Sequence, residues 1–319
     1  MTLLVTGASG HVGQEIVRQA TERGLDVVAV SRGGRPSEEL TSSLGKVVWI
    51  PCDLADAEAV AALARDHRIT TCIHGAAVSN EAYARPDPLA AITTNVSATA
   101  NLLEAARLGD WRRFLLISTG SVFQCRKDAV SPILEDEPPA PKNIYSTTKV
   151  SAEMLVRLYR TEFDLSAASV RISWVYGPPV IADAPTRGPI PSYLLRSLRG
   201  EAIDEPGGDF AASFTFVGDV AAGLLTAADV DRLSSDIYHL GPGRNYNVRD
   251  VADAVMAAVP DARIALGPGT EPWTRFTALR GPLAGNRLLS DTGFAPKHSL
   301  NQGIAAYADW MRDNRARWS

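Results

Sequence analysis

The chain has few cysteines, no excess of basic residues and no long apolar run, and each absence excludes a class of protein. Its 319 residues include three cysteines, Cys52, Cys72 and Cys125, which lie far apart. An odd number at these separations predicts neither a disulfide framework nor a metal site. We therefore expect reduced thiols that serve a structural purpose.

Charge and hydropathy exclude two kinds of partner. Lys and Arg number 32 against 36 Asp and Glu, which gives a formal net charge of −4, so nucleic acid is not an expected partner. No apolar stretch approaches the ~20 residues of a membrane span, so no membrane partner is expected. The first residues lack the basic region and apolar stretch of a signal peptide. We expect a soluble, cytoplasmic protein of ordinary globular composition.

Short β-branched runs alternate with longer helical patterns in the first half of the chain. The strand candidates are Leu3–Thr6, Asp26–Ser31, Val47–Pro51, Thr71–His74, Phe114–Ser118 and Ser166–Ile172. The helical candidates are Gly13–Arg23, Ala57–Asp66, Pro88–Leu108 and Asn143–Phe163. Such alternation predicts a parallel sheet covered on both faces. With right-handed crossovers, this is a doubly wound α/β sheet, the Rossmann fold.

Proline and glycine become frequent after Gly177, which predicts a loop-rich lobe with one helix, Ser192–Leu198. The segment Phe214–Val217, a helix over 219–228 and the strand Ile237–Leu240 could return to the main sheet. Two further helices are expected, Asn247–Val259, with Asn247 as N-cap, and Leu300–Asn314. We expect residues 1–176 and 214–241 to form a dinucleotide-binding domain. Residues 177–213 and 242–319 would then form a smaller substrate-binding lobe.

Three glycines, Gly7, Gly10 and Gly13, lie between the first strand and the first helix. Glycine at this spacing lets the backbone turn tightly and approach a pyrophosphate, whose charge the helix N-terminus meets. The motif therefore predicts a dinucleotide site, in which the intervening Ser9, His11 and Val12 are further candidates.

The end of the second strand favours one cofactor over another. An NAD site usually has Asp or Glu there, bonded to the ribose 2′-hydroxyl, but this strand ends in Ser31-Arg32. Because Arg32 could pair with a 2′-phosphate, we favour NADP over NAD. Asp53, followed by Leu54 after the third strand, could bond the adenine amino group or cap the helix that begins near Asp56.

Tyr145 and Lys149 are four residues apart in a predicted helix, so both side chains lie on one face. A phenol alone is a weak acid, with a pKa near 10. A nearby ammonium and a positively charged nicotinamide both favour the phenolate, which would make Tyr145 useful in general acid–base catalysis. Ser118, Thr119 and Ser121 follow a neighbouring strand, and their hydroxyls could orient a substrate oxygen.

Together these motifs resemble an extended short-chain dehydrogenase/reductase of the NAD(P)-dependent epimerase/dehydratase family, over nearly the whole chain. The segments that carry the resemblance are Thr6–Gly13, Asp53-Leu54, Ile73–Ala77, Thr94–Val96, Asn101–Ala105, Ile117–Phe123, Tyr145–Lys149, Arg171–Pro178 and Phe214–Val220.

The resemblance implies a role for each matched residue. Tyr145 is the acid/base, Lys149 its electrostatic partner, which could also hold the nicotinamide ribose, and Thr119 the substrate-orienting hydroxyl, with Ser121 as a further catalytic candidate. Asn95 supports the active site and counts with Ala76, Ala77 and Val175 among the candidate cofactor contacts. The candidate substrate contacts are Ser79, Thr119, Gly120, Ser121, Tyr145, Trp174 and Arg187. Family members are commonly homodimers, in which helices near 88–108 and 143–163 pack as a four-helix bundle.

Departures from the family pattern bear on the substrate. Dehydratases of the family carry an Asp-Glu pair where this chain has Gly120 and Ser121. Nucleotide-sugar epimerases usually have Asn at the place of Trp174 and a diphosphate-binding Arg at the place of Ala212. Arg187 or Arg196 could substitute, or either could be a solvated charge. Trp174 could line the substrate pocket or pack in the core.

The leading hypothesis is an NAD(P)-dependent oxidoreductase that moves a hydride to or from a secondary alcohol or ketone of a small, sugar-like substrate. A nucleotide-sugar epimerase with transient oxidation by bound NAD is the second hypothesis, because the same tyrosine and lysine serve it. A non-catalytic NADP-binding sensor is the third.

Overall fold

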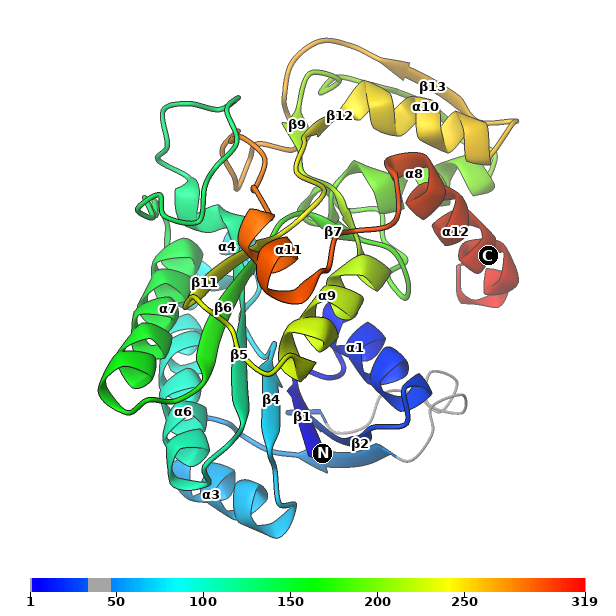
Figure 1. The fold of residues 1–319 in the computed structure, drawn as a ribbon. Helices are drawn as coiled ribbons and strands as arrows, with labels where there is room; N and C mark the ends of the chain where they lie inside the picture. Colours follow the sequence, from blue (N-terminus) through cyan, green and yellow to red (C-terminus); the bar gives the residue numbers. More distant parts are fainter. Residues whose placement is uncertain (1, 34–46, 319) are drawn as a thin grey trace.

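A computed structural model describes residues 2–33 and 47–318 of the chain. Its centre is a seven-stranded sheet in the order β11-β6-β5-β4-β1-β2-β3, and all neighbouring strands are parallel (Figure 1). The strands are β1 (Thr2–Thr6), β2 (Asp26–Ser31), β3 (Val47–Pro51), β4 (Thr71–His74), β5 (Arg113–Thr119), β6 (Ala167–Ile172) and β11 (Ile237–Leu240). The expected doubly wound α/β fold is confirmed.

Helices bury both faces of this sheet. Along β1, Leu3 and Val5 face one side and Leu4 the other, because side chains alternate along a strand. The first side is covered by α1 (His11–Glu22) and α9 (Val217–Asp229), and the second by α3 (Ala57–Asp66), α6 (Ala98–Leu108) and α7 (Ile144–Glu162) (Figure 1). Burial on both faces explains why the strands are continuous apolar runs.

The strand order reverses between β1 and β4, which places a crevice at their carboxyl ends. The register sets Thr6 opposite both His74 of β4 and Val30 of β2, so the three strands end at the same level. In open α/β sheets, ligands bind at such a switch point. The turn that follows β1 carries the three glycines.

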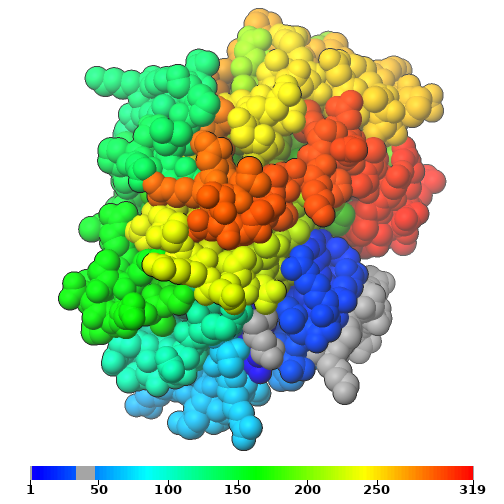
Figure 2. Space-filling model, in the orientation of Figure 1, coloured from blue at the N-terminus to red at the C-terminus, as the bar shows by residue number. Residues whose placement is uncertain are grey.

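The C-terminal lobe has a separate apolar core above the crevice. Its helices are α8 (Pro189–Leu198), α10 (Val248–Ala258) and α12 (Leu300–Asp313), and its two-stranded sheets pair β8 (Ala202–Glu205) with β13 (Arg263–Leu266) and β9 (Ala211–Ala212) with β12 (Tyr246–Asn247). As predicted, Asn247 caps α10, and Asp250 completes a reciprocal capping box. In the space-filling view, α11 (Asn286–Thr292) lies over the region of α9 (Figure 2).

Three predictions about elements need correction. The helix expected over Pro88–Leu108 is divided into α5 (Pro88–Ile92), a π-helical turn (Thr93–Ser97) and α6. Phe214–Val217 does not rejoin the main sheet: β10 (Thr215–Phe216) pairs with β7 (Val175–Tyr176), because the chain leaves the sheet at Trp174, whose φ is +37°. The helix α11 was not expected from the sequence. None of the helices in the described ranges is both long and apolar enough to span a bilayer.

A buried ion pair joins α7 to the sheet below the crevice. Arg171 of β6 donates to both carboxylate oxygens of Glu153, at 2.9 Å and 2.7 Å, and the Ser118 hydroxyl of β5 donates to the same carboxylate. The side chains of Arg171 and Glu153 are 3% and 5% exposed, so neither charge can be solvated if its partner is removed.

We predict that Arg171→Met lowers the free energy of unfolding by roughly 3–5 kcal/mol, because it leaves the Glu153 carboxylate buried without a counter-charge. The matched control is Arg65→Met, which removes an ion pair with Asp66 whose side chains are 73% and 59% exposed and should cost at most about 1 kcal/mol. Denaturant titrations of both variants make the comparison. Equal losses would show that the buried pair contributes no more than a surface pair.

Candidate active site

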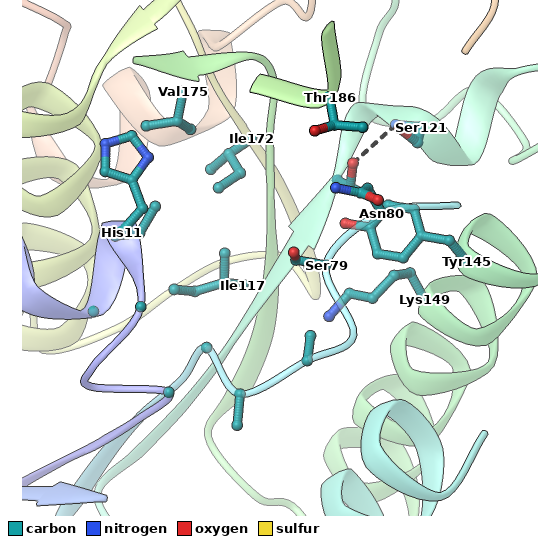
Figure 3. Close-up of a pocket in the computed structure, with 18 of the residues that line it drawn as sticks. His11, Ser79, Asn80, Ile117, Ser121, Tyr145, Lys149, Ile172, Val175 and Thr186 are labelled. Atoms are coloured by element: carbon teal, nitrogen blue, oxygen red, sulfur yellow. Dashed lines mark hydrogen bonds between the residues drawn. The ribbon is translucent and has the colours of Figure 1, made fainter. Parts of the chain in front are cut away.

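A cavity of about 830 Å³ lies along the carboxyl ends of the strands, between the sheet and the C-terminal lobe. Its walls include the glycine turn after β1, the ends of β4 and β5, the first turns of α7 and loops of the C-terminal lobe. Figure 3 shows His11 at one side of this cavity and Tyr145, Lys149, Ser79 and Ser121 at the other. One cavity therefore extends from the glycine turn to Tyr145.

The glycine turn fits a dinucleotide pyrophosphate. Gly7 has φ +66°, and a Cβ there would lie 2.7 Å from the Ala76 nitrogen; a Cβ on Gly13 would lie 2.1 Å from the Gly7 oxygen. Only glycine allows the turn to approach the β4 loop and the helix so closely. Gly10 is the N-cap of α1 and supplies no side-chain cap. The N-terminus of α1 is therefore available to an anion in the cavity.

His11 connects the glycine turn to the loop after β7. Its Nε2 donates to the Gly177 carbonyl at 3.0 Å, since a carbonyl can only accept. Burial, followed by the charge of Arg187, lowers the pKa of His11 to about 4. The imidazole is therefore neutral at physiological pH and adds no positive charge to the cofactor site.

The end of β2 and the residues that follow β3 line one part of the cavity. Ser31, Arg32, Asp53 and Leu54 all line it. The Asp53 carboxylate accepts from the Ala55 backbone N–H at 3.0 Å, whereas Asp56 itself caps α3 through the Glu58 and Ala59 N–H groups. The alternative in which Asp53 caps this helix is therefore wrong.

A chain of hydrogen bonds fixes the close approach of β1 and β4. The Thr99 hydroxyl donates to the Asn95 carbonyl at 2.8 Å, so it accepts from His74 Nε2 at 3.0 Å. His74 Nδ1 then accepts from the Thr6 hydroxyl at 2.6 Å, and that hydroxyl accepts from the Gly75 and Ala76 N–H groups at 3.2 Å. Burial, followed by the Lys149 charge, lowers the pKa of His74 to about 3, so this neutral tautomer persists.

Asn95 is at the π-helical turn, which points its side chain toward the wall of the cavity. Its Oδ1 accepts from the Val78 N–H at 2.8 Å, and its Nδ2 donates to the Thr148 hydroxyl at 2.9 Å. Thr148 in turn donates to the Tyr145 carbonyl at 2.9 Å. Asn95 is 1% exposed and does not line the cavity. Its position is that of a support between the β4 loop and α7, and not that of a direct cofactor contact.

Tyr145 and Lys149 enter the cavity from the first turns of α7, as the spacing predicted (Figure 3). The Tyr145 N–H at the helix start donates to the Glu81 carboxylate at 3.1 Å. Burial lowers the pKa of Lys149 to about 8, although the Glu153 carboxylate one turn later opposes this. The ammonium is therefore charged in most molecules at neutral pH.

Burial raises the pKa of Tyr145, which is opposite to the direction that we expected. Hydrogen bonding to the Thr119 hydroxyl and the charge of Arg280 partly offset this rise. Thr119 also accepts from the Ser121 N–H at 3.0 Å, which holds its hydroxyl at the end of β5. The tyrosine is consequently a phenol that hydrogen-bonds to a fixed hydroxyl, as a proton donor to a substrate oxygen requires.

The structure brings nearly all the predicted residues to this one cavity, and Asn95 and Gly120 are the exceptions. Trp174 could line the substrate pocket or pack in the core, and it does both. It lines the cavity, and its ring packs edge-on against Phe210 with the ring centroids 5.3 Å apart. Arg187 lines the cavity, whereas Arg196 is paired with Glu205 at 2.9 Å outside it.

Sequence reasoning missed Glu81, Trp273, Phe276 and Arg280, which also line the cavity. Glu81 opens the short helix α4 (Glu81–Ala84), and the other three lie in the loop between β13 and α11. No motif surrounds them, so no local signal in the sequence could have identified them.

Comparisons with known proteins agree with this geometry. The chain is 27% identical to a dTDP-glucose 4,6-dehydratase of Xanthomonas campestris, covering 98% of this chain and 94% of that protein. It is also 27% identical to a UDP-glucose 4-epimerase of Mycolicibacterium smegmatis, covering 98% and 99%. A solved structure of a Thermus thermophilus UDP-glucose 4-epimerase in complex with NAD matches with a TM-score of 0.80 and 26% identity, over 98% of this chain and 99% of that one. Residues 3–241 match the model of the NAD dependent epimerase/dehydratase family, and the chain therefore belongs to that family of extended short-chain dehydrogenases/reductases.

Proposed function

We propose that this protein is an NAD(P)-dependent oxidoreductase that acts on a secondary alcohol or ketone of a small, sugar-like substrate. The observation that supports this most is the arrangement of Tyr145 and Thr119 in the same cavity as the glycine turn. One end of the cavity fits a dinucleotide, and the other presents a proton donor beside a fixed hydroxyl.

The side chains of this chain divide the work around a bound cofactor. The glycine turn and the N-terminus of α1 would hold the pyrophosphate, and a bound nicotinamide would supply hydride chemistry at the substrate carbon. Thr119, with Ser121, holds the substrate oxygen, and Tyr145 gives that oxygen a proton in reduction or removes one in oxidation. Because burial raises the pKa of Tyr145, the phenol is protonated at neutral pH and is ready to act as the acid.

We predict that Tyr145→Phe lowers kcat by about 10²–10⁴-fold, because it removes only the group that transfers the proton. Binding of NAD(H) or NADP(H), measured by titration, should be nearly unchanged, since the phenyl ring keeps the shape of the site. The control is Tyr83→Phe, which alters a tyrosine that is 50% exposed and outside the cavity. Full turnover by Tyr145→Phe would refute the mechanism.

We further propose that the cofactor is NADP rather than NAD. The carboxylate that would bond a ribose 2′-hydroxyl is missing at the end of β2, where Ser31 and Arg32 line the cavity. The Arg32 side chain is exposed at its edge and could pair with a 2′-phosphate. NAD stays the alternative, because the Thermus thermophilus structure is described as a complex with NAD.

Arg32→Ala should weaken NADPH binding by about tenfold or more, since a charge-assisted hydrogen bond contributes about 1.5–3 kcal/mol. NADH binding should change little, because NADH has no 2′-phosphate. Fluorescence titration of both cofactors measures this, with the exposed Arg23→Ala as a control for loss of one positive charge. Tighter binding of NADH than of NADPH by the unaltered protein would contradict the preference.

A nucleotide-sugar epimerase with tightly bound NAD is the second candidate, because both relatives named above act, by their names, on nucleotide sugars. Against it, the places of the expected diphosphate ligands hold Trp174 and Ala212, and Ala212 is 5% exposed in β9.

The two candidates differ in their effect on the cofactor. We expect net oxidation or reduction, which changes the absorbance of added cofactor in proportion to the product formed. An epimerase would convert a nucleotide sugar with no net change in absorbance and would often purify with NAD bound. Conversion of UDP-glucose or dTDP-glucose without that change would favour the second candidate.

We also propose a homodimer formed by α5, α6 and α7. Large apolar side chains are exposed on these helices, including Leu89 at 75%, Leu108 at 70% and Met154 at 66%, and a solvent-exposed set of this kind is typical of an interface. We also propose a cytoplasmic location. We further propose that the chain is divided into a dinucleotide-binding domain, residues 1–176 and 214–241, and a substrate-binding lobe, residues 177–213 and 242–319.

A further inference from the structure

The cavity contains a buried cation for which the protein provides no carboxylate. Arg280, in the loop before α11, is 7% exposed and lines the cavity. Its Nη1 donates to the Thr277 hydroxyl at 3.0 Å and to the Ala278 carbonyl at 3.3 Å. Among residues 2–33 and 47–318, no Asp or Glu forms an ion pair with it. A buried guanidinium without a counter-charge is costly, which suggests that its partner arrives with the ligand.

The guanidinium lies beside the reacting groups and not at the entrance of the cavity. A Cβ on Gly120 would lie 3.3 Å from Arg280 Nε, so the absence of a side chain at Gly120 makes room for the arginine next to Thr119. The charge of Arg280 also acts on the Tyr145 phenol. An anion bound by Arg280 would therefore be close to the substrate oxygen that Tyr145 and Thr119 hold.

The two carboxylates among the residues that line the cavity are directed elsewhere. The Glu81 carboxylate accepts from the Tyr145 N–H, and the Asp53 carboxylate accepts from the Ala55 N–H, so neither is directed at Arg280. Arg280 uses Nη1 for its two protein contacts, which leaves Nε and Nη2 for a ligand. Two neighbouring N–H groups of a guanidinium match the two oxygens of a carboxylate.

The walls around Arg280 favour a compact substrate. Trp174, Pro272, Trp273 and Phe276 line the same cavity as Arg280, and Trp174 and Ala212 hold the places where the family pattern has polar ligands for a nucleotide diphosphate. The charge that orients the substrate must then come from the reacting fragment itself.

We propose that the substrate carries a carboxylate next to the reacting carbinol, and that Arg280 binds this carboxylate. The substrate class is thus a small polyhydroxy acid and not a neutral sugar. This inference rests on the proposed oxidoreductase function, and it identifies Arg280 as the residue that determines specificity.

The test compares D-gluconate with D-glucitol, which differ only by a carboxylate in place of a hydroxymethyl group next to a secondary alcohol. Calorimetric titration into the protein saturated with NADPH measures binding without turnover. We expect gluconate to bind at least about tenfold more tightly, as a charge-assisted bidentate contact predicts. Arg280→Met should abolish this preference, and Arg280→Lys, which keeps the charge but loses the planar fork, should retain only part of it.

The matched control is Arg275→Met, which removes an exposed arginine of the same loop and should keep the full preference. Unchanged NADPH binding and melting temperature show that each Arg280 variant is folded. Equal binding of gluconate and glucitol, binding of neither at millimolar concentration, or a preference that persists in Arg280→Met would each overturn the proposal. If inorganic phosphate binds to the NADPH-saturated protein and gluconate does not, the proposal is overturned in favour of a phosphorylated substrate.

Failure of the inference can be told apart from failure of the proposed function. If Tyr145→Phe abolishes turnover while Arg280→Met only shifts the pH profile and keeps the gluconate preference, Arg280 acts on the tyrosine and the carboxylate assignment is wrong. If the protein does not bind NADPH or NADH, the proposed function itself fails.

Discussion

The close approach of the turn after β1 to the loop after β4 is the constraint on which the rest of the structure depends. Gly7 comes so near to Gly75 and Ala76 that a single methyl group would prevent it. The Thr6 hydroxyl accepts from the Gly75 and Ala76 N–H groups of the β4 loop, and the Gly75 N–H also donates to the Thr6 carbonyl at 3.1 Å. A neutral His74 holds that hydroxyl in place. The turn after β1 and the loop after β4 therefore form one hydrogen-bonded unit at the wall of the cavity. None of its residues is a catalytic candidate.

The second support of the site is α7, which connects the chemistry to the sheet. Its first turns present Tyr145 and Lys149, and one turn later Glu153 is paired with Arg171 of β6. The same helix is held from the other side by Asn95, through Thr148. The break in the helical pattern at Thr93–Ser97 gives Asn95 this reach, which is a common reason for a π-helical turn near a functional site. Two buried polar networks thus fix the orientation of one helix.

The C-terminal lobe contributes chemistry to the cavity as well as a cover for it. Arg280 and the aromatic side chains Trp273 and Phe276 come from one irregular loop, yet they meet groups from β5 and α7. The family pattern explains the half of the cavity that would hold the cofactor. The proposed specificity depends on the other half, which Trp174 lines. Trp174 stands where the family pattern expects a polar group, as do Gly120 and Ala212, which do not line the cavity.

Local patterns in the sequence determined the fold and identified the candidate residues for cofactor binding and proton transfer. The strands Asp26–Ser31, Val47–Pro51 and Thr71–His74 were predicted with their observed bounds, because apolar runs between turn residues are local signals. The glycine spacing and the pair Tyr145 and Lys149 are also local, since both follow from the geometry of one turn and one helix. The raised pKa of Tyr145, the π-helical turn and the buried position of Arg280 were decided only by the tertiary structure. The pKa of Tyr145 and the position of Arg280 depend on burial and on segments that are more than a hundred residues apart in the sequence. The π-helical turn accompanies a hydrogen bond from Asn95 to the distant Thr148. No local pattern contains that information.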